Sequence, residues 1–405
     1  MLTQEENELL SRVSNGAPMG EMMKKHWWIP VARSANVEPD GKPLRVRLFA
    51  KNYVAFRATN GKAGFFDEAC PHRGASLALG RNEDNALRCI YHGWKFNVEG
   101  QTVEVPTQPN NQAEYCKHVP LKHYPVRESA GIIWVWLGEG EQAPEFPKLP
   151  FIDLPAENMV VFRQKVNANW LQAVETTMDS AHLGVLHQSW LVGFGDIEYS
   201  SANMAPVYHV AQKPYGFRYA AVRELKDQRN YVRTNAFVMP WYGIVSPNQA
   251  EIKGGSAFFS IPIDDENIWY WQITYRTEEK LVLNKTHHFT DADSWPPLPP
   301  GKPDENWGQD REAMKNGHFT GFTQMLGTED FAVIQSMGPI QDRTREFLGA
   351  GDGAVLAVRR CLTRAVREFM SGEVPELAKH EEIDYAVAIP KSMVVEKTMD
   401  WRAML

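Results

Sequence analysis

The sequence has few cysteines and no long apolar or basic runs. Its 405 residues include only four cysteines, and the net charge of −7 is spread along the chain. This charge distribution argues against binding to nucleic acid or to an anionic membrane surface. No apolar run approaches the length that crosses a bilayer, and the first eight residues are acidic where a signal peptide is basic. We therefore expect a cytoplasmic protein.

A further absence concerns nucleotide cofactors. No Gly-x-Gly-x-x-Gly sequence follows a predicted strand, so the usual signature of a nicotinamide or flavin site is missing. Cys116 and Cys361 stand alone and are expected to be free thiols in a reducing compartment. The other two cysteines each lie close to a histidine.

The chain is long enough for two to three domains, and 43% of its residues are hydrophobic. Helical patterns flank a Gly-Ala-Pro break in the first 30 residues, and alternating runs then predict a small antiparallel domain: 46–49, 53–56 and 131–137. A Pro-rich stretch over 142–150 marks a boundary. The expected organisation is an N-terminal helical segment that packs on the last domain, an all-β domain and a larger domain, over 1–40, 41–145 and 146–405.

The larger domain mixes helices and strands. Helical patterns cover 165–190 and run again from 328 through 355 to 369. Four strand-like segments lie between them: 215–225, 231–240, 255–262 and 268–276. The predicted fold class is α+β, with an antiparallel sheet and helices grouped at one side.

Two cysteines and two histidines form paired half-sites. Cys70-Pro-His72 is followed, after sixteen residues, by Cys89-Ile-Tyr-His92. Two thiolates on one iron and two imidazoles on the other are the ligands of a Rieske [2Fe-2S] centre, which relays single electrons. A Cys2His2 zinc site is the alternative, although zinc sites usually group Cys with Cys and His with His. A disulfide between the two cysteines is the third interpretation.

A second group of ionisable residues lies in the first helical stretch of the larger domain. Glu175, Asp179 and His182 fall within roughly 60° of one another on an ideal helix, so they share a face. His187 would lie roughly 140° round the axis from His182. A π-bulge or a break at Gly184 could bring the two imidazoles together.

The two histidines of this stretch suggest a metal site. Two histidines and one carboxylate on one side of a metal form the facial triad of non-haem Fe(II) oxygenases. Asp330 is the predicted third ligand, because it is an acid inside an otherwise apolar helical stretch. Glu329 is its neighbouring competitor, and Asp342 is a weaker one. Taken alone, a His-x4-His pair is more often a surface or capping pair, but the upstream Cys and His pairs favour the metal site.

The chain resembles the Rieske non-haem iron ring-hydroxylating oxygenases over nearly its whole length. The resemblance rests on Cys70, His72, Cys89 and His92, on the run from Glu175 to His187, and on Asp330 with the downstream Gly338, Asp342, Arg343 and Glu346. The opening Met-Leu-Thr-Gln-Glu-Glu-Asn, the Gly-Ala-Pro-Met-Gly stretch and Ser180 look like the phthalate dioxygenase branch, whose enzymes have α-type subunits only.

The resemblance implies a fold, two cofactors and an assembly. The all-β domain is a Rieske domain whose four Cys and His residues hold the cluster, and the catalytic domain over 146–405 is of the helix-grip type. His182, His187 and Asp330 hold a mononuclear Fe(II), and Asp179 bridges a Rieske histidine of one subunit and an iron-ligating histidine of the next. Such a bridge implies a homotrimer, or a hexamer made of trimers.

The resemblance also implies the reaction class. The chain would be a terminal oxygenase, supplied by an NAD(P)H-dependent flavin and iron–sulfur reductase, that dihydroxylates an aromatic carboxylate such as a phthalate or a benzoate. Monooxygenation that demethylates or cleaves an aryl ether acid is the alternative reaction. A Rieske electron carrier without catalysis is the alternative from another class.

Substrate-binding residues are expected near the iron helix and on the sheet that follows it. In the branch, arginines of this region and a serine like Ser180 grip the acid, which points to Arg218, Arg223 and Arg233. Exposure on the sheet surface is the alternative for each arginine. Four aromatic residues could line a slot for the ring or pack in the core: Trp241, Tyr242, Phe258 and Phe259.

Overall fold

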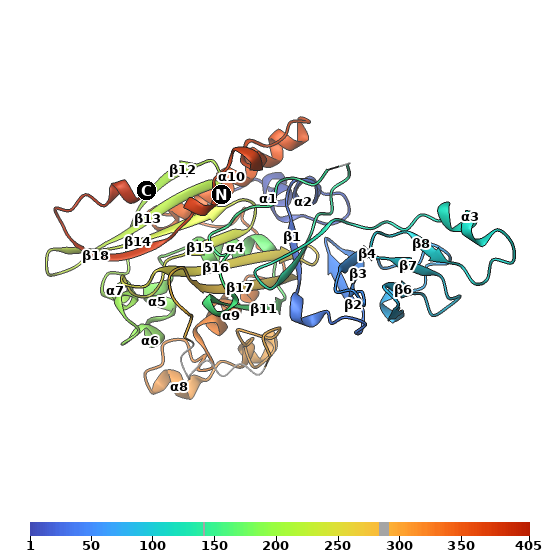
Figure 1. Ribbon diagram of the computed structural model, residues 1–405. Coiled ribbons are helices and arrows are strands. Elements are labelled where there is room, and N and C mark those ends of the chain that lie inside the picture. Colours follow the sequence, from blue (N-terminus) through green and yellow to red (C-terminus); the bar gives the residue numbers. More distant parts are fainter. Residues whose placement is uncertain (141, 283–290) are drawn as a thin grey trace. The chain divides into compact units, whose positions relative to one another are not determined.

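The computed structural model describes residues 1–140, 142–282 and 291–405, which form two compact units (Figure 1). One comprises Met1–Met22 and Pro147–Leu405, and the other comprises Met23–Phe146. The expected segment 1–40 is therefore divided, within α2 (Pro18–His26), because β1 (Ile29–Arg33) pairs with β10 (Ile132–Val135) of the smaller unit. The domain limits 41–145 and 146–405 stay predictions.

The smaller unit is built from three antiparallel sheets. The first contains β1, β10 and β9 (Val126–Ser129), and the second contains β2 (Leu44–Leu48), β3 (Lys51–Arg57) and β4 (Ala63–Asp67). The third contains β5 (Arg81–Glu83), β6 (Ala86–Arg88), β7 (Lys95–Asn97) and β8 (Thr102–Glu104), and α3 (Gln112–Lys117) follows it. Phe56, Phe66, Leu87 and Phe96 belong to one buried cluster drawn from the second and third sheets. The β-rich character predicted from the alternating runs is confirmed.

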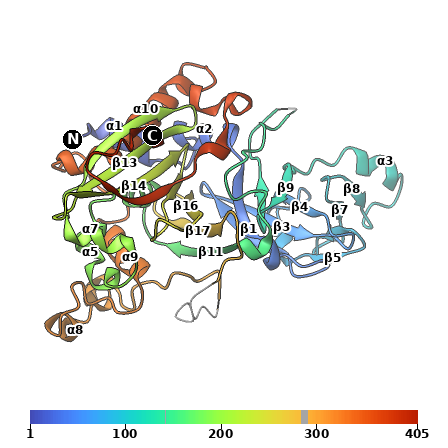
Figure 2. The same cartoon turned by 60° about the vertical axis from the view of Figure 1, so that its left-hand side comes forward.

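The larger unit contains an eight-stranded antiparallel sheet (Figure 2). The strand order is β11-β17-β16-β15-β14-β13-β12, and β18 also pairs with β14. The strands are β11 (Met159–Val166), β12 (Val207–Lys213), β13 (Gly216–Glu224), β14 (Arg229–Val238), β15 (Tyr242–Val245), β16 (Gly254–Pro262), β17 (Ile268–Arg276) and β18 (Lys391–Glu396). The four strand predictions correspond to β13, β14, β16 and β17.

The larger unit also contains helices. They are α1 (Gln4–Ser11), α4 (Trp170–Met178), α5 (Leu183–Leu186), α6 (Gln188–Leu191), α7 (Tyr199–Ala202), α8 (Arg311–Lys315), α9 (Leu326–Ser336) and α10 (Gly353–Met370). Among them, α4 packs on β15 and β16, and α10 packs on β12, β13 and α4. Within the described ranges, no helix combines the length and the apolar character that crossing a membrane requires.

Two helical predictions are wrong in their continuity. The stretch 165–190 includes the end of β11 and then forms three separate helices, because Asp179 leaves helical backbone after α4. The stretch 328–369 is interrupted between α9 and α10. Gly338 adopts a φ of +87° just after α9 and Pro339 follows it, and this order of residues ends a helix.

Candidate active site

Two loops of the smaller unit, one after β4 and one between β6 and β7, hold the pairs Cys70 with His72 and Cys89 with His92. Both loops close in the same way. The cysteine N–H donates at 2.8 Å to the carbonyl five residues later, and the N–H of Gly74 or Gly93 donates back to the cysteine carbonyl at 2.8 or 2.9 Å. The two glycines have φ values of +76° and +77°, which other residues rarely adopt.

The donor atoms of these loops fit an iron–sulfur cluster. The Cys70 and Cys89 thiols are buried, and the ring centroids of His72 and His92 are 4.5 Å apart. Nδ1 of His92 is buried and has no hydrogen-bond partner among the described residues, as a metal-ligating nitrogen would be. Burial raises the pKa of Cys70 to about 11, so its thiolate needs a nearby positive charge, which a cluster supplies.

The other interpretations of these four residues fit less well. Cys70 and Cys89 are free and form no disulfide. In the described part of the chain, only His182, His187 and Asp330 bring three or more potential ligand atoms within 4.8 Å of one another. The Cys and His side chains of the two loops are therefore spaced more widely than one zinc ion requires, whereas two bridged irons need such spacing.

The residues at the two ends of α4 position the second candidate site, which contains His182 and His187. Asn169 caps the start of α4 by accepting a hydrogen bond from the Leu171 N–H at 3.1 Å. At the other end, Asp179 becomes extended, and its carboxylate accepts the N–H groups of Ala181 at 2.7 Å and of His182 at 3.3 Å. This local pattern competes with helix continuation and restarts the chain as α5.

His182 and His187 meet, although five residues separate them. Their ring centroids are 5.1 Å apart, because α5 is a single turn and His187 already leaves helical geometry with φ −95° and ψ 9°. The predicted bulge or break at Gly184 is wrong. Gly184 lies inside α5, where a Cβ atom would come within 2.1 Å of the Ser200 carbonyl oxygen, so glycine is needed for close packing against α7.

His182, His187 and Asp330 form a candidate metal site. Oδ1 of Asp330, on α9, is 3.6 Å from Nε2 of His182 and 3.1 Å from Nε2 of His187. Nε2 of His187 and Oδ1 of Asp330 are buried without any other polar partner among the described residues. Burial lowers the pKa of His187, but Asp330 and Glu329 outweigh burial and raise the pKa to about 9. The donor set therefore attracts positive charge, and its ligand types suit Fe(II).

A carboxylate lies behind each imidazole. Oδ2 of Asp179 is 3.3 Å from Nδ1 of His182, and Oε2 of Glu329 is 2.6 Å from Nδ1 of His187. An ionised carboxylate only accepts hydrogen bonds, so each Nδ1 carries a proton and donates it, and Nε2 is the nitrogen left for a metal. Both Nε2 atoms face Asp330.

The two competitors for the third ligand position lie elsewhere. Glu329 is on the Nδ1 side of His187, away from the point that the three donors share. Asp342 is exposed, and its carboxylate accepts hydrogen bonds from the N–H and hydroxyl of Thr344. Only Asp330 faces both histidines.

A cavity of about 470 Å³ adjoins the candidate metal site. Its floor is one face of the sheet. Apart from Gly255, the lining residues alternate along four strands: Val160 and Phe162 on β11, Arg233 and Asn235 on β14, Ser256 and Phe258 on β16, and Tyr270, Gln272, Thr274 and Arg276 on β17. Residues of α4, α5 and α9 complete the wall. His182, His187 and Asp330 are part of this lining, so a ligand in the cavity can reach them.

The predicted substrate residues have different surroundings. Ser180 and Arg233 line the cavity, whereas Arg218 and Arg223 are absent from its lining. Arg223 is fully buried and donates to the carbonyl and hydroxyl oxygens of Ser180. Arg218 donates to the carbonyl of Val387. Arg223 therefore supports the cavity wall from behind.

Arg233 and Arg276 are the two arginines of the cavity. Arg233 donates to the Ser246 carbonyl at 3.0 Å, and its buried Nε has no hydrogen-bond partner in the described ranges. Arg276 was missed by the sequence analysis, although its place on β17 in phase with Gln272 could have indicated it. Burial lowers the pKa of Arg276, and Glu279 opposes this at a distance of 4.0 Å. Of the four aromatic candidates, Phe258 alone lines the cavity.

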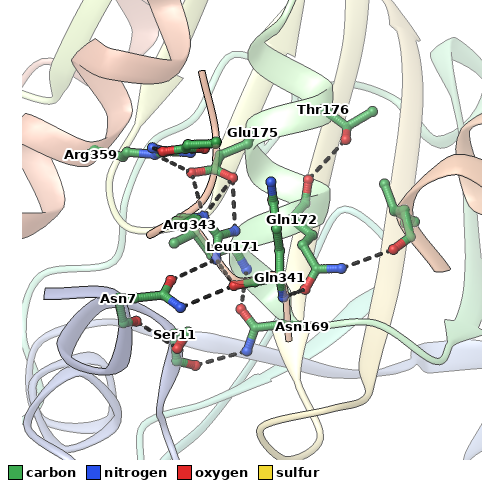
Figure 3. A network of polar contacts seen from close by, with 12 residues as sticks. Asn7, Ser11, Asn169, Leu171, Gln172, Glu175, Thr176, Gln341, Arg343 and Arg359 are labelled. Carbon is green, nitrogen blue, oxygen red and sulfur yellow. Dashed lines mark hydrogen bonds and ion pairs between the residues drawn. The ribbon is translucent and has the colours of Figure 1, made fainter. Parts of the chain in front are cut away.

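Glu175 belongs to a buried ion cluster rather than to the metal site (Figure 3). Its carboxylate accepts hydrogen bonds from Arg343 at 2.8 and 3.0 Å and from Arg359 at 2.6 Å. Arg343 also donates to Asn7 of α1, and Arg359 pairs with Glu346. The cluster joins α1, α4 and α10 one turn before Asp179.

The chain is similar to known proteins over nearly its whole length. Residues 27–125 match the family model "Rieske [2Fe-2S] domain", and residues 135–405 match "LigXa C-terminal domain like". The chain is 39% identical to the phthalate 4,5-dioxygenase oxygenase subunit of Pseudomonas putida, over 99% of this chain and 94% of that protein. It is 30% identical to the 5,5'-dehydrodivanillate O-demethylase oxygenase subunit of Sphingobium sp., over 96% and 87%.

Solved structures support the fold. The QL mutant of NdmA from Pseudomonas putida CBB5, with caffeine, superposes with a TM-score of 0.63 at 19% identity, over 95% of this chain and all of that chain. The predicted fold class, a Rieske domain followed by a domain with an antiparallel sheet and helices, is confirmed.

Proposed function

The chain belongs to the Rieske non-haem iron ring-hydroxylating oxygenases, and on this basis we propose that it is a terminal oxygenase that dihydroxylates an aromatic carboxylate. Its cofactors are a Rieske [2Fe-2S] cluster and a mononuclear non-haem iron. We assign the cluster to Cys70, His72, Cys89 and His92, and the mononuclear iron to His182, His187 and Asp330. When bound, the cluster supplies single electrons and the iron activates dioxygen.

The observation that carries the substrate proposal is Arg233, a buried arginine with an unused Nε, in the same cavity as the candidate metal ligands. No carboxylate of the described residues pairs with it, so its charge favours an anionic ligand. A guanidinium binds a carboxylate through two parallel hydrogen bonds, which orients the bound acid. Phe162, Phe258 and Phe331 line the same cavity and offer apolar contact to a ring. The names of relatives that act on phthalate and chlorobenzoate support this choice.

The protein residues have separate tasks in this proposal. Arg233 binds the carboxylate and sets which edge of the ring faces the metal ligands. The aromatic wall excludes water from the ring. Asp179 and Glu329 accept hydrogen bonds from Nδ1 of His182 and His187, so that both rings are held with Nε2 turned toward the position of the metal.

The proposal is tested by metal analysis together with oxygen uptake. Three irons and two acid-labile sulfides per chain are expected of the oxygenase, whereas two of each would indicate an electron carrier. With an NADH-driven reductase, oxygen uptake should be stimulated by one or more of phthalates, chlorobenzoates, phenoxybenzoates and methoxybenzoates. Equal indifference to the whole panel would contradict the aromatic acid proposal.

Arg233→Gln should raise KM for the acid substrate by roughly 10- to 100-fold, the usual cost of a lost hydrogen bond to a charged group. The same change should have little effect on the methyl ester of that acid, because the ester has no anionic charge to lose. Arg218→Gln is the matched control, since Arg218 lies outside the cavity lining. Steady-state oxygen uptake measures both variants, and an unchanged KM in Arg233→Gln would remove the anchor.

O-demethylation of an aryl ether acid is the second candidate function. It is favoured by the O-demethylase relative, which is 30% identical over most of both chains. The same cavity and anchor serve both reactions, and the group placed nearest the metal ligands decides between them. With a methoxybenzoate, release of formaldehyde would indicate demethylation, whereas a cis-diol retaining the methoxy group would indicate dioxygenation.

The electron route is proposed to cross between subunits. Asp179 is suited to a bridge because its carboxylate contacts His182 while about a quarter of its side chain, 24%, stays exposed. We infer a homotrimer in which this exposed side meets a Rieske histidine of the neighbouring subunit, and light scattering would test the trimer. An NAD(P)H-dependent flavin and iron–sulfur reductase is the proposed electron donor, and the cytoplasm is the proposed location.

Asp179→Asn should leave the iron and sulfide contents unchanged but slow cluster oxidation in single turnover by at least about 10-fold, because the proposed carboxylate bridge between the histidines of two subunits is lost. Stopped-flow absorbance of the reduced cluster after mixing with oxygen and substrate measures this rate. Tyr208→Phe is the control, since it removes the 3.2 Å hydrogen bond to Asp179 and keeps the carboxylate. Wild-type rates in Asp179→Asn would rule out the bridge.

A further inference from the structure

Glu329 and Thr320 form a buried support behind His187. Glu329 is completely buried and precedes Asp330 on α9. Successive helix residues point about 100° apart, so the two acids approach His187 from different sides. Oε2 of Glu329 lies 2.6 Å from Nδ1 of His187, and the Thr320 hydroxyl donates to Oε1. Each oxygen of this buried carboxylate therefore has a donor.

The directions of these hydrogen bonds are fixed by the donors available. The Phe322 N–H donates to the Thr320 hydroxyl at 3.2 Å, so that hydroxyl uses its single proton on Glu329. Glu329, as an anion, can only accept from Nδ1 of His187. The chain of bonds consequently keeps a proton on Nδ1 and leaves Nε2 directed at Asp330.

Thr320 is itself anchored independently of α9. Its carbonyl accepts a hydrogen bond from the Gln309 side chain at 2.6 Å, and the preceding Phe319 N–H donates to the Ser189 hydroxyl of α6 at 2.8 Å. The segment around Thr320 thus ties α6, which follows His187 directly, to the carboxylate that holds the imidazole.

The two imidazoles are supported unequally. His187 and Glu329 are both fully buried with a 2.6 Å contact, whereas His182 and Asp179 keep 19% and 24% of their side chains exposed and contact at 3.3 Å. A short bond between buried, charge-paired groups resists displacement more than a long bond near solvent. His187 is the more firmly held of the two.

We propose that Glu329 and Thr320 are positioning residues that lock His187 as the fixed ligand of a divalent metal, while His182 remains the adjustable one. Glu329 would act through His187 by fixing its tautomer and by adding one buried negative charge that balances the cation. This inference rests on the proposed role of His182, His187 and Asp330 as ligands, and it concerns metal binding independently of oxygenation.

Cobalt(II) binding to the full-length, cluster-containing protein after removal of the mononuclear iron tests the proposal. Affinity is measured by competition with a fluorescent chelator. Electron paramagnetic resonance of the oxidised protein then reports Co(II) geometry, because the oxidised cluster is diamagnetic. The variants are Glu329→Gln, which keeps shape and removes charge, and the matched pair Thr320→Val and Thr320→Ser.

Glu329→Gln is expected to weaken Co(II) binding by about 10- to 100-fold, the usual effect of losing a partner that orients a ligand. Thr320→Val should weaken binding in the same direction and change the resonance, whereas Thr320→Ser, which keeps the hydroxyl, should match the wild type. The Thr320 pair keeps the test decisive if Glu329→Gln loses its cluster spectrum. Equal affinity and identical resonance in the wild type and in every variant that keeps this spectrum would overturn the positioning role. Failure of the wild type itself to bind Co(II) would instead overturn the ligand set, and this inference with it.

Discussion

Asp330→Ala should reduce product formation by at least about 100-fold and lower the iron content from three toward two per chain, while the visible spectrum of the cluster is retained. Among the residues that the structure describes, Asp330 is the only negative donor that faces both Nε2 atoms, at 3.6 and 3.1 Å. Without it, two neutral imidazoles would have to hold a divalent cation. Loss of a metal ligand should reduce metal affinity more than loss of a residue that only orients a ligand, which usually reduces it by about 10- to 100-fold.

The measurement is iron and sulfide analysis of the purified variant beside the wild type. Asp342→Ala is the matched control, because Asp342 is the competing acid of the sequence analysis and is exposed away from the histidines. Wild-type iron content in Asp330→Ala would move the third ligand elsewhere. Loss of the cluster spectrum would mean that the two metal sites do not fold independently.

Four of the eight strands of the described sheet, β13, β14, β16 and β17, were predictable because their signal is local. The strand-like run 268–276 identified β17, and the register Arg276 opposite Gly254 and Thr274 opposite Ser256 keeps in-phase residues on one face. The local sequence also indicates the interruption between α9 and α10, because Gly338 and Pro339 end a helix. The prediction of one continuous helical stretch over 328–369 was based on overall composition and missed this interruption.

The candidate ligands were predictable for a different reason. Asp330 stood out as an acid in an apolar stretch, and the fold brings it to both histidines. The position of His187 could not be derived from helical periodicity, because α5 is a single turn whose start is set by the carboxylate of Asp179. Gly184 has its reason in the packing of α7, which no local pattern reveals.

The roles of the arginines could not be separated by sequence. Arg223 and Arg233 both lie on strands and are both buried. One donates to the carbonyl and hydroxyl of Ser180, and the other lines the cavity and has a buried Nε without a hydrogen-bond partner among the described residues. Which guanidinium is satisfied by protein oxygens depends on tertiary contacts, so parity along a strand cannot decide it. The same holds for Glu329, whose partner Thr320 lies nine residues away.

Glu175→Gln should destabilise the larger unit by about 3–5 kcal/mol, since removing one partner of a buried ion pair leaves uncompensated charge. Arg343 is fully buried and Arg359 is nearly so, and both point their guanidinium groups at this carboxylate (Figure 3). Urea unfolding followed by tryptophan fluorescence measures the change. The control is Glu312→Gln on α8, whose exposed pair with Lys315 should contribute below about 1 kcal/mol.

The double variant Glu175→Gln with Arg343→Met should recover part of the lost stability, because the charge left unpaired in the single variant is then removed as well. A double variant whose loss equals the sum of the two single losses would show that Glu175 and Arg343 do not interact energetically.

The stability that Glu175 contributes should also depend on pH. Burial alone would raise its pKa, but Arg343 and Arg359 outweigh burial and hold the pKa below its usual value. A group whose pKa is lower in the folded state contributes its full stability above the unfolded value of about 4.3 and loses it as the pH falls through the folded value. The difference in unfolding free energy between wild type and Glu175→Gln should therefore be constant near pH 7 and shrink below about pH 4. If the difference in unfolding free energy stays the same at acidic pH, the effect comes from poor packing of the glutamine side chain, because glutamine does not titrate.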